Sequence, residues 1–526
     1  MRVLVCDKVS EKGIQILQNA GITVDVKLKQ TEDEIVNIVG DYQAVIVRSE
    51  TKITKRIIEA GNQLKVIGRA GVGVDNIDVE AATMKGIVVC NAPEGNTIAA
   101  AELTMSHMLA LARKIYPAAN ALKGGQWARS KYTGVELKGK ILGILGLGKI
   151  GSEVAKFAQA FGMTIYGYDP YVTEERAKNL GVEIKSLEEI YAHADFITVH
   201  MPKTKETYRM ISTEQLAMMK DGVRLINCAR GGIIDEEALY NAIVSGKVAG
   251  AGIDVFEKEP TTESPLFGLE QVLVTPHLGA STEEAQVNVA IDVSEEIVRV
   301  LHGEVVRAAV NIPSVKPELM AIFAPYLDLI ERLGRFIGQT VNGSIEKVTI
   351  SYAGDLAKHN LNPLTTSFLK GMFKPSLQDS VNFVNAPHVA KQRGIKVSEI
   401  KTGDTEDYSN LITATVETSK GTRSVAGTVL RRNRGHILRV DDYNLNVELE
   451  GHMIVAPHYD RPRIIGGIGT VLGEHEINIA HMHVGRNVVG GEAIAILSVD
   501  AAVPTEAVKE LAKVDGVLDV KYVDLT

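Results

Sequence analysis

Short apolar runs alternate with amphipathic segments over the first 96 residues of the chain. The apolar runs predict buried strands at residues 3–6, 44–48, 65–69 and 87–91. Hydrophobic positions spaced three or four apart predict helices between these strands, such as 11–20 and 53–60. Strands that alternate with helices in this way are typical of an α/β unit.

The same alternation returns over residues 140–280, between two long helical stretches. These stretches predict helices at 97–115 and 281–303, and a strand-like piece at 305–310 follows the second helix. Because two long helices bracket the second unit, we expect it to be inserted into the first domain, which residues near 290–312 then complete. A ligand site is expected between the two units, since small-molecule pockets favour domain interfaces.

The alternation stops beyond Pro313. Residues 314–448 predict a separate domain with strands at 347–352, 411–418, 424–429 and 436–440. From residue 453 the predicted order is strand, helix, strand, strand, helix, strand. This is the βαββαβ order of ferredoxin-like units.

Composition and charge narrow the functional classes. A chain of 526 residues is too long for one core, and about 150 residues per domain predicts three or four domains. A net charge of −8 with few basic clusters argues against a nucleic-acid partner. With no apolar run of about 18 residues and no signal peptide, we expect no membrane partner. Three distant cysteines, Cys6, Cys90 and Cys228, predict reduced core residues in a cytoplasmic protein.

A glycine fingerprint supplies the first chemical signal. Gly146, Gly148 and Gly151 have G-x-G-x-x-G spacing between an apolar run at 141–147 and a helical face of Val154, Phe157, Ala158 and Phe161. In dinucleotide-binding turns these glycines make the tight turn, admit the pyrophosphate and let helix and strand pack closely. The phosphates then meet a helix N-terminus, which favours negative charge.

Asp169 identifies the expected dinucleotide. It ends the next predicted strand, about 20 residues beyond the fingerprint, where a carboxylate binds the adenosine ribose hydroxyls. No arginine follows directly to bind a 2′-phosphate, so NAD is favoured over NADP. The alternative is that Asp169 is only a turn residue before Pro170.

Polar residues follow three later apolar runs, at 225–232, 251–260 and 274–280. Open α/β sheets bind ligands at such strand ends. His277 suits a general base because imidazole titrates near neutral pH, and Glu259 suits a partner that orients its ring. Arg230 suits a bidentate grip on a carboxylate. Taken singly, each residue has a structural explanation as a turn or strand-end residue, and their joint occurrence favours a site.

The 146–151 fingerprint, together with the motifs at 228–232, 254–260 and 275–280, resembles the NAD-dependent D-2-hydroxyacid dehydrogenases. The resemblance covers essentially the whole chain and points to the long members, which oxidise 3-phospho-D-glycerate to 3-phosphooxypyruvate at the start of L-serine synthesis. It implies that Arg230 binds the substrate carboxylate and carbonyl, that His277 transfers the proton, and that Glu259 pairs with His277. It also implies an NAD site lined by Val72, Gly146, Gly148, Lys149, Ile150, Gly151, Asp169, Met201, Cys228, Ala229, Arg230, Asp254, His277, Gly279 and Ala280.

The phosphate of such a substrate needs cations. Arg48, Ser49 and Arg69 end apolar runs in the first unit, and Arg129 follows the first long helix. Arginine suits phosphate. The resemblance places these residues and Asn96 at the substrate, whereas from sequence alone the arginines could be ordinary strand-end charges.

The C-terminal unit resembles an ACT domain, a small module that often binds amino acids between paired copies. His458, Asp460 and Asn478 look like the serine-binding set, so L-serine is a candidate effector and a homo-oligomer, dimer or tetramer, is implied. Arg463 stands where many ACT domains have glycine, which leaves serine feedback open. His481 and His483 share a strand face, but no third ligand accompanies them, so we expect no metal.

The predicted fold class is therefore α/β. A Rossmann-type nucleotide domain at 97–287 is inserted in a flavodoxin-like substrate domain at 1–96 and 288–313, and an α+β intervening domain at 314–448 and a ferredoxin-like ACT domain at 452–526 follow. Two rival functions remain. A glyoxylate or hydroxypyruvate reductase would tolerate loss of Arg48 and Arg69. A corepressor of this fold would sense NAD without turnover, but the middle region and the ACT-like tail argue against it.

Overall fold

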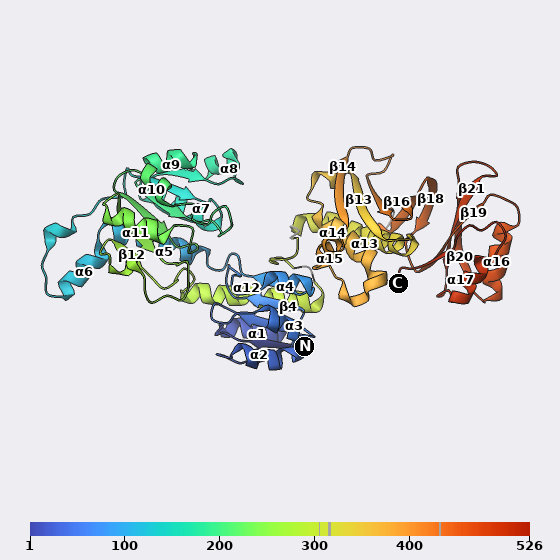
Figure 1. The fold of residues 1–526 in the computed structure, drawn as a ribbon, viewed down its shortest axis with the longest axis horizontal. Coiled ribbons are helices and arrows are strands. Elements are labelled where there is room, and N and C mark those ends of the chain that lie inside the picture. Colours follow the sequence, from blue (N-terminus) through green and yellow to red (C-terminus); the bar gives the residue numbers. More distant parts are fainter. Residues whose placement is uncertain (305, 314–316, 431–432) are drawn as a thin grey trace.

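The computed structural model describes residues 1–304, 306–313, 317–430 and 433–526. Figure 1 shows an elongated molecule in which four sheet-containing units follow one another. The N-terminal unit and the long helix α12 lie between the second unit on one side and the third on the other, and the fourth unit forms the far end.

The first unit is a five-stranded parallel sheet in the order β2-β1-β3-β4-β5. This is the order of flavodoxin-like folds. Its strands are β1 (Arg2–Val5), β2 (Thr23–Val26), β3 (Ala44–Val47), β4 (Val66–Arg69) and β5 (Val88–Asn91). Its helices are α1 (Glu11–Asn19), α2 (Glu32–Ile38), α3 (Lys55–Ala60) and α4 (Val79–Met84).

Helix α12 (Glu283–His302) packs on this first sheet although it follows the second sheet in sequence. Its Val293 lies over Gly68 of β4, where a Cβ would come within 2.6 Å of the valine side chain. Further along, Ala309 forms an antiparallel bridge with Cys90. The chain therefore returns to its first unit after building the second.

The second unit is a seven-stranded parallel sheet in the order β12-β11-β10-β9-β6-β7-β8. Counted from β6, this is the doubly wound order 3-2-1-4-5-6 with one added strand, and the order reverses between β6 and β9. Its strands are β6 (Ile141–Leu145), β7 (Thr164–Tyr168), β8 (Glu183–Ile184), β9 (Phe196–Val199), β10 (Val223–Asn227), β11 (Val248–Ile253) and β12 (Val272–Val274).

Helices cover both faces of the second sheet. α5 (Thr97–Ala112) and α7 (Lys149–Ala160) share one buried cluster with β6, and the other face packs on α9 (Leu187–His193), α10 (Thr213–Met218) and α11 (Glu236–Val244). The remaining elements are α6 (Ile115–Lys123), α8 (Glu174–Asn179) and the 3-10 turns at 39–41, 129–132 and 265–268.

Two predicted elements differ from the structure here. The single helix expected at 97–115 ends at Ala112, because Lys114 adopts a left-handed φ of 50° and a second helix, α6, starts after it. The strand-like piece expected at 305–310 forms only the Ala309 bridge, and Val305 lies outside the described residues.

The third unit has a mixed six-stranded sheet in the order β14-β13-β15-β16-β17-β18. Its strands are β13 (Ile345–Gly354), β14 (Lys396–Thr402), β15 (Asn410–Thr418), β16 (Gly421–Val429), β17 (Gly435–Val440) and β18 (Tyr443–Glu448). Its helices are α13 (Pro317–Thr340), α14 (Asn362–Leu377) and α15 (Ala386–Gln392), with 3-10 turns at 355–358 and 378–380. The four predicted strands are confirmed, whereas the long helices were missed.

Glycines explain how α13 and α14 pack. A Cβ at Gly334 would lie 2.2 Å from the carbonyl oxygen of Phe368, and one at Gly371 would lie 2.0 Å from that of Glu331. The two backbones are therefore in direct contact. Gly334 and Gly371 weaken the helical signal in sequence, as does the proline inside each helix, yet the glycines permit this close packing.

The fourth unit is a four-stranded antiparallel sheet in the order β20-β21-β19-β22, and its βαββαβ order is as predicted. It consists of β19 (His452–Tyr459), α16 (Ile464–Glu474), β20 (Ile479–Arg486), β21 (Glu492–Val499), α17 (Thr505–Leu511) and β22 (Lys521–Asp524). Met453 and Val523 belong to the buried cluster of the third unit. Arg335 of α13 also donates to the carbonyl of Thr526 at 2.8 Å, so the last two units share a core.

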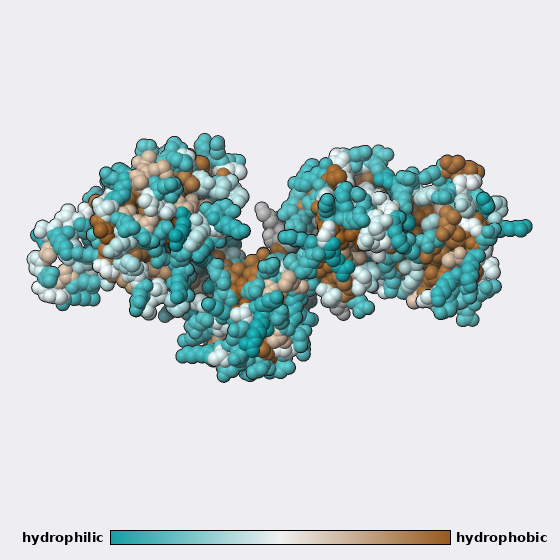
Figure 2. Space-filling model, viewed as in Figure 1, coloured by the Kyte–Doolittle hydropathy of each residue, from teal (hydrophilic) through white to brown (hydrophobic). Residues whose placement is uncertain are grey.

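One face of the fourth unit exposes many apolar side chains. Figure 2 shows hydrophobic surface gathered over this C-terminal unit. Its exposed apolar side chains include Met482 and Val484 of the edge strand β20, and Val488 and Val489 of the following loop.

Candidate active site

The turn from β6 into α7 has the geometry of a dinucleotide-binding turn. Gly146 adopts φ +101°, and a Cβ there would lie 2.6 Å from the carbonyl oxygen of His200. A Cβ at Gly151 would lie 2.0 Å from the carbonyl oxygen of Gly146. Gly148 has open space in front of it and no side chain caps the helix that it begins. The free amides of α7 can therefore meet a phosphate.

Asp169 lies beside this turn, directly after β7. Its Oδ2 accepts a hydrogen bond from the Leu147 amide at 2.9 Å, and its Oδ1 accepts one from the Tyr171 amide at 2.8 Å. A carboxylate oxygen has two acceptor positions, so both oxygens can still bind ribose hydroxyls.

His277 and Glu259 form a pair. His277 Nδ1 lies 2.6 Å from Glu259 Oε2, and the Phe256 amide donates to Glu259 Oε1 at 2.8 Å. Burial raises the pKa of Glu259, but the hydrogen bonds from His277 and Phe256 and the charges of His277 and Arg230 lower it more, so its pKa lies below the ordinary 4.5. A carboxylate at Nδ1 leaves Nε2 of the neutral imidazole free as a proton acceptor.

Two arginines from different sheets approach each other near this pair. Arg230, after β10, pairs through Nε with Asp75 at 3.2 Å and donates to the carbonyl of Ala229 at 2.7 Å. Arg69, at the end of β4, is partly buried, and this burial together with the charge of Arg230 lowers its pKa to about 10. Its Nε has no partner among the described residues. Two cations held this close favour an anionic ligand.

A glycine-rich loop makes the approach of these arginines possible. A Cβ at Gly71 would lie 1.8 Å from Arg69 Nη1, and one at Gly73 would lie 1.9 Å from Arg230 Nη2. The sequence placed Val72 of this stretch at the NAD site but gave no indication that Asp75 is the partner of Arg230. The signal was present in the run Gly71-Val-Gly-Val-Asp75.

The other expected substrate residues divide into two groups. Arg48 and Ser49 follow β3 in the first unit, with the Arg48 amide donating to Asp7 at 2.6 Å. Asn96 precedes α5, and its buried Oδ1 has no partner among the described residues. Arg129, in contrast, is exposed in the segment after α6, and no described contact joins it to Arg230 or His277.

Most of the remaining expected NAD residues lie in loops that follow strands of the second sheet, while Lys149 and Ile150 begin α7 and Val72 follows β4. Lys149 pairs with Glu94 at 2.5 Å, and the carbonyl of Val72 accepts from the Asn91 side chain at 2.5 Å. Burial, together with the charge of Asp254, raises the pKa of the Cys228 thiol to about 12, which keeps the thiol protonated at neutral pH. The others in this set are Ile150, Met201, Ala229, Asp254, Gly279 and Ala280.

The expected effector residues are each engaged within the fourth unit. His458 is buried and contacts the carbonyl of Ala493 through Nδ1 at 3.1 Å. Asp460 accepts from Arg486 at 2.9 Å, and hydrogen bonds from the Gly490 amide and Arg486 lower its pKa. Asn478 donates to Asp500 at 2.6 Å. Arg463, where a glycine is usual, adopts φ +79° before α16, a conformation that favours glycine.

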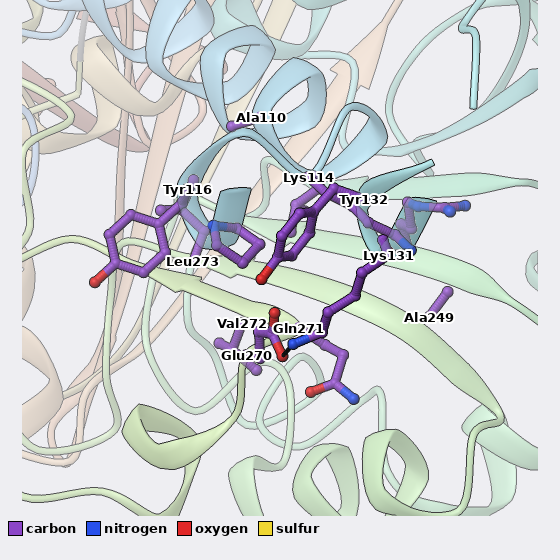
Figure 3. Close-up of a pocket in the computed structure, with 13 residues that line it drawn as sticks. Ala110, Lys114, Tyr116, Lys131, Tyr132, Ala249, Glu270, Gln271, Val272 and Leu273 are labelled. Atoms are coloured by element: carbon purple, nitrogen blue, oxygen red, sulfur yellow. Dashed lines mark hydrogen bonds and ion pairs between the residues drawn. The ribbon is translucent and has the colours of Figure 1, made fainter. Parts of the chain in front are cut away.

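A separate cavity of about 220 Å³ lies under the junction of α5 and α6 (Figure 3). Tyr116, Lys131, Tyr132, Glu270 and Leu273 are among its lining residues, and Lys131 pairs with Glu270 at 2.8 Å. It lies toward the amino ends of β10, β11 and β12, away from His277, so it is not part of the site described above.

Family models match three segments of the chain. Residues 105–279 match the D-isomer specific 2-hydroxyacid dehydrogenase NAD binding domain, 322–441 match the D-3-phosphoglycerate dehydrogenase intervening domain, and 453–516 match the ACT domain. With the fold and the site described above, these matches define an NAD-binding oxidoreductase, a D-isomer specific 2-hydroxyacid dehydrogenase.

Similar proteins show to which family of 2-hydroxyacid dehydrogenases the chain belongs. The chain is 48% identical over its whole length to D-3-phosphoglycerate dehydrogenase of Synechocystis sp., covering 95% of that protein, and 45% identical to the Archaeoglobus fulgidus enzyme of the same name, covering all of it. It belongs to the D-3-phosphoglycerate dehydrogenase family. A solved D-lactate dehydrogenase from Aquifex aeolicus, complexed with NAD and lactic acid, is 28% identical and aligns with a TM-score of 0.54 over 60% of this chain and all of its own.

No described helix is long and apolar enough to cross a membrane. No group of three or more His, Cys, Asp or Glu side chains in the described part of the chain is arranged to hold a metal ion.

Gly148→Ala tests the fingerprint. A Cβ at this position meets no protein atom but occupies the side on which the pyrophosphate must approach the backbone, so NADH affinity should fall about tenfold or more while the fold is kept. NADH titration by fluorescence measures the affinity, and thermal unfolding gives the control. Unchanged NADH affinity would contradict the assignment of this turn to the cofactor.

Proposed function

We propose that this protein oxidises 3-phospho-D-glycerate to 3-phosphooxypyruvate with NAD, the entry step of L-serine biosynthesis. The relatives of matching length carry the name of that activity. The observation that carries the proposal is the close approach of Arg69 and Arg230 beside the His277–Glu259 pair. This site combines a base with two cations, as a phosphorylated hydroxy acid requires.

Each residue has one step in the proposed reaction. Arg230 binds the substrate carboxylate and orients C2. His277 Nε2 takes the proton of the C2 hydroxyl, and Glu259 stabilises the imidazolium that results. A bound NAD would supply the acceptor for the hydride that leaves C2 as the carbonyl forms. One hydride and one proton leave the substrate, which balances its oxidation to the keto acid.

Recognition of the phosphate distinguishes this activity from that of a glyoxylate or hydroxypyruvate reductase. We assign the phosphate to Arg48 and Arg69, with Ser49 and Asn96 nearby, and we keep Arg129 as a further candidate. The unpartnered Nε of Arg69 and Oδ1 of Asn96 support a polar ligand here, because a buried polar atom without a partner is unfavourable. A substrate without a phosphate would leave them unsatisfied.

We further propose the domain limits stated above, with the nucleotide domain at 97–287 inserted in a substrate domain made of 1–96 and 288–313. The packing of α12 on the first sheet supports this division. A cytoplasmic location is supported by Cys6, Cys90 and Cys228, which are buried free thiols.

His277→Ala tests the base. Removal of a positioned base commonly costs about 10²- to 10⁴-fold in turnover, so kcat should fall by that factor while NADH still binds. The measurement is NADH formation from 3-phosphoglycerate with the keto product removed by a coupled reaction, alongside NADH titration. Turnover close to that of the unmodified protein would refute the role of His277.

L-serine is the proposed effector of the ACT domain. Asp460 directly follows β19 and Asn478 directly precedes β20, at opposite ends of the sheet, so one amino acid could contact both residues only between paired copies of the domain, where it would replace their present partners Arg486 and Asp500. Millimolar L-serine should then slow NADH formation, and Asn478→Ala should remove that inhibition without changing the uninhibited rate. D-serine is the matched control. A rate indifferent to L-serine would retain the enzyme and reject this effector.

We also propose that two or four copies associate, with helix α6 as a contact. No residue of α6 is buried, and Ile115, Tyr116 and Leu122 expose large apolar side chains, as does Trp127 just beyond it. Such surface usually marks a protein interface.

Sedimentation of the full chain tests this association. A mass of two or four times 56.9 kDa is expected, and the double variant Ile115→Glu, Leu122→Glu should lower it by placing charge in the contact. Asn120→Glu, a polar position on the same helix, is the control. An unmodified protein that sediments as a single chain would refute the association.

A further inference from the structure

A buried polar chain runs from helix α5 to the loop that carries His277. His107 of α5 is 1% exposed and Asp254, directly after β11, is 0% exposed. The hydroxyl of Thr275 lies between them, 3.1 Å from His107 Nε2 and 2.6 Å from Asp254 Oδ1. We infer that His107 and Thr275 are positioning residues, which hold the catalytic loop at 275–279 in place through the carboxylate of Asp254. The inference rests on the proposed role of His277.

Only one assignment of donors and acceptors is consistent for His107, Thr275 and Asp254. Asp254 accepts from the amides of Leu278 at 2.7 Å and Gly279 at 3.0 Å, as a carboxylate does. Thr275 therefore donates its single hydroxyl proton to Asp254 and can only accept from His107. The imidazole of His107 thus carries its proton on Nε2. Burial lowers the pKa of His107, which keeps the ring neutral at neutral pH.

This arrangement fixes His277 from both sides. Thr275 precedes His277 and the Leu278 and Gly279 amides follow it, and all three donate to the one carboxylate. The His277 amide also donates to the backbone carbonyl of Asp254 at 2.8 Å. His277 has φ +55°, a conformation that is uncommon for residues other than glycine and needs support from its surroundings. The buried carboxylate provides that support.

Core packing alone does not account for His107. Its Nδ1 has no hydrogen-bond partner among the described residues, and it faces Gly252 so closely that a Cβ there would lie 2.7 Å away. A buried ring nitrogen without a partner disfavours the folded state, so an apolar side chain would serve packing at least as well. The hydrogen bond from Nε2 to Thr275 is what histidine adds.

Helix α5 also links these hydrogen-bonded side chains to the proposed substrate residues. It begins just after Asn96, and His107 lies about 16 Å further along the helix axis. One rigid element therefore carries a proposed substrate residue at its start and the support of the catalytic loop near its end.

Thr275→Val and Thr275→Ser test the inference in the full-length protein. Valine keeps the shape but removes the hydroxyl, so kcat should fall about 10- to 100-fold, as expected when a reacting group is misplaced. The KM for 3-phosphoglycerate should change by less than about twofold, because Arg48, Arg69 and Arg230 bind that substrate from other loops. Serine keeps the hydroxyl and should restore most of kcat.

A second pair of variants tests the donor. His107→Leu removes it and should lower kcat severalfold, whereas His107→Gln retains an N–H that can reach Thr275 and should recover most of the rate. Met108→Leu is the control for packing, because Met108 is buried on the same helix but takes no part in the hydrogen bonds of His107, Thr275 and Asp254. If thermal unfolding shows that Thr275→Val or His107→Leu does not fold, the variants at the other position test the inference.

Three results would overturn the inference. The first is a kcat for Thr275→Val within twofold of that of the unmodified protein. The second is an equal loss of kcat in Thr275→Val and Thr275→Ser. The third is a loss of kcat in Met108→Leu as large as that in His107→Leu. An unmodified protein without activity on 3-phosphoglycerate would instead refute the proposed function, which separates the two failures.

Discussion

The active site depends on two parallel sheets that bring their carboxyl strand ends together, where Arg230 of the second unit pairs with Asp75 of the first. In a parallel sheet every strand ends at the same edge, so the loops after β6, β7, β10, β11 and β12 meet there without long excursions. The first sheet adds the loop after β4, which carries Arg69. Because α12 returns from the second unit to pack on the first, both sheets belong to one scaffold. The catalytic and substrate groups thus come from separate units, yet each sits at a strand end.

The charges at this site are distributed asymmetrically. Arg230 has Asp75 as a partner, while Arg69 lies partly buried beside another cation, with its buried Nε unpartnered among the described residues. The arrangement is unfavourable until an anion enters, so part of the binding energy of an anionic ligand comes from relieving it. Glu259 contributes the opposite charge where an imidazolium must form, and its lowered pKa keeps it ionised in neutral solution. A neutral alcohol would gain little from such a site.

The third and fourth units contact each other more closely than the sequence pattern, which predicts separate domains, suggests. Helix α13 belongs to the third unit, yet its Arg335 and Gln339 donate to the backbone of Thr526 and Asp524, and the two units share one buried cluster. A ligand that moved the ACT sheet would therefore act on α13 directly. The contact between the backbones of α13 and α14 leaves little room for these helices to slide independently.

Local pattern alone determined much of this protein. The periodicity of apolar residues predicted most strands of the first two sheets, though not β2, β8 or β9, and the βαββαβ order of the last. The glycine spacing located the nucleotide turn. These features depend on residues close in sequence. The long helices α13 and α14 were missed because proline and glycine inside them weaken the helical signal, whereas their packing makes these residues acceptable. Only the tertiary structure paired Arg230 with Asp75, placed Arg69 beside Arg230, and joined His107 to Thr275 across 168 positions. Contacts of this kind depend on how distant elements pack, and no local pattern encodes that.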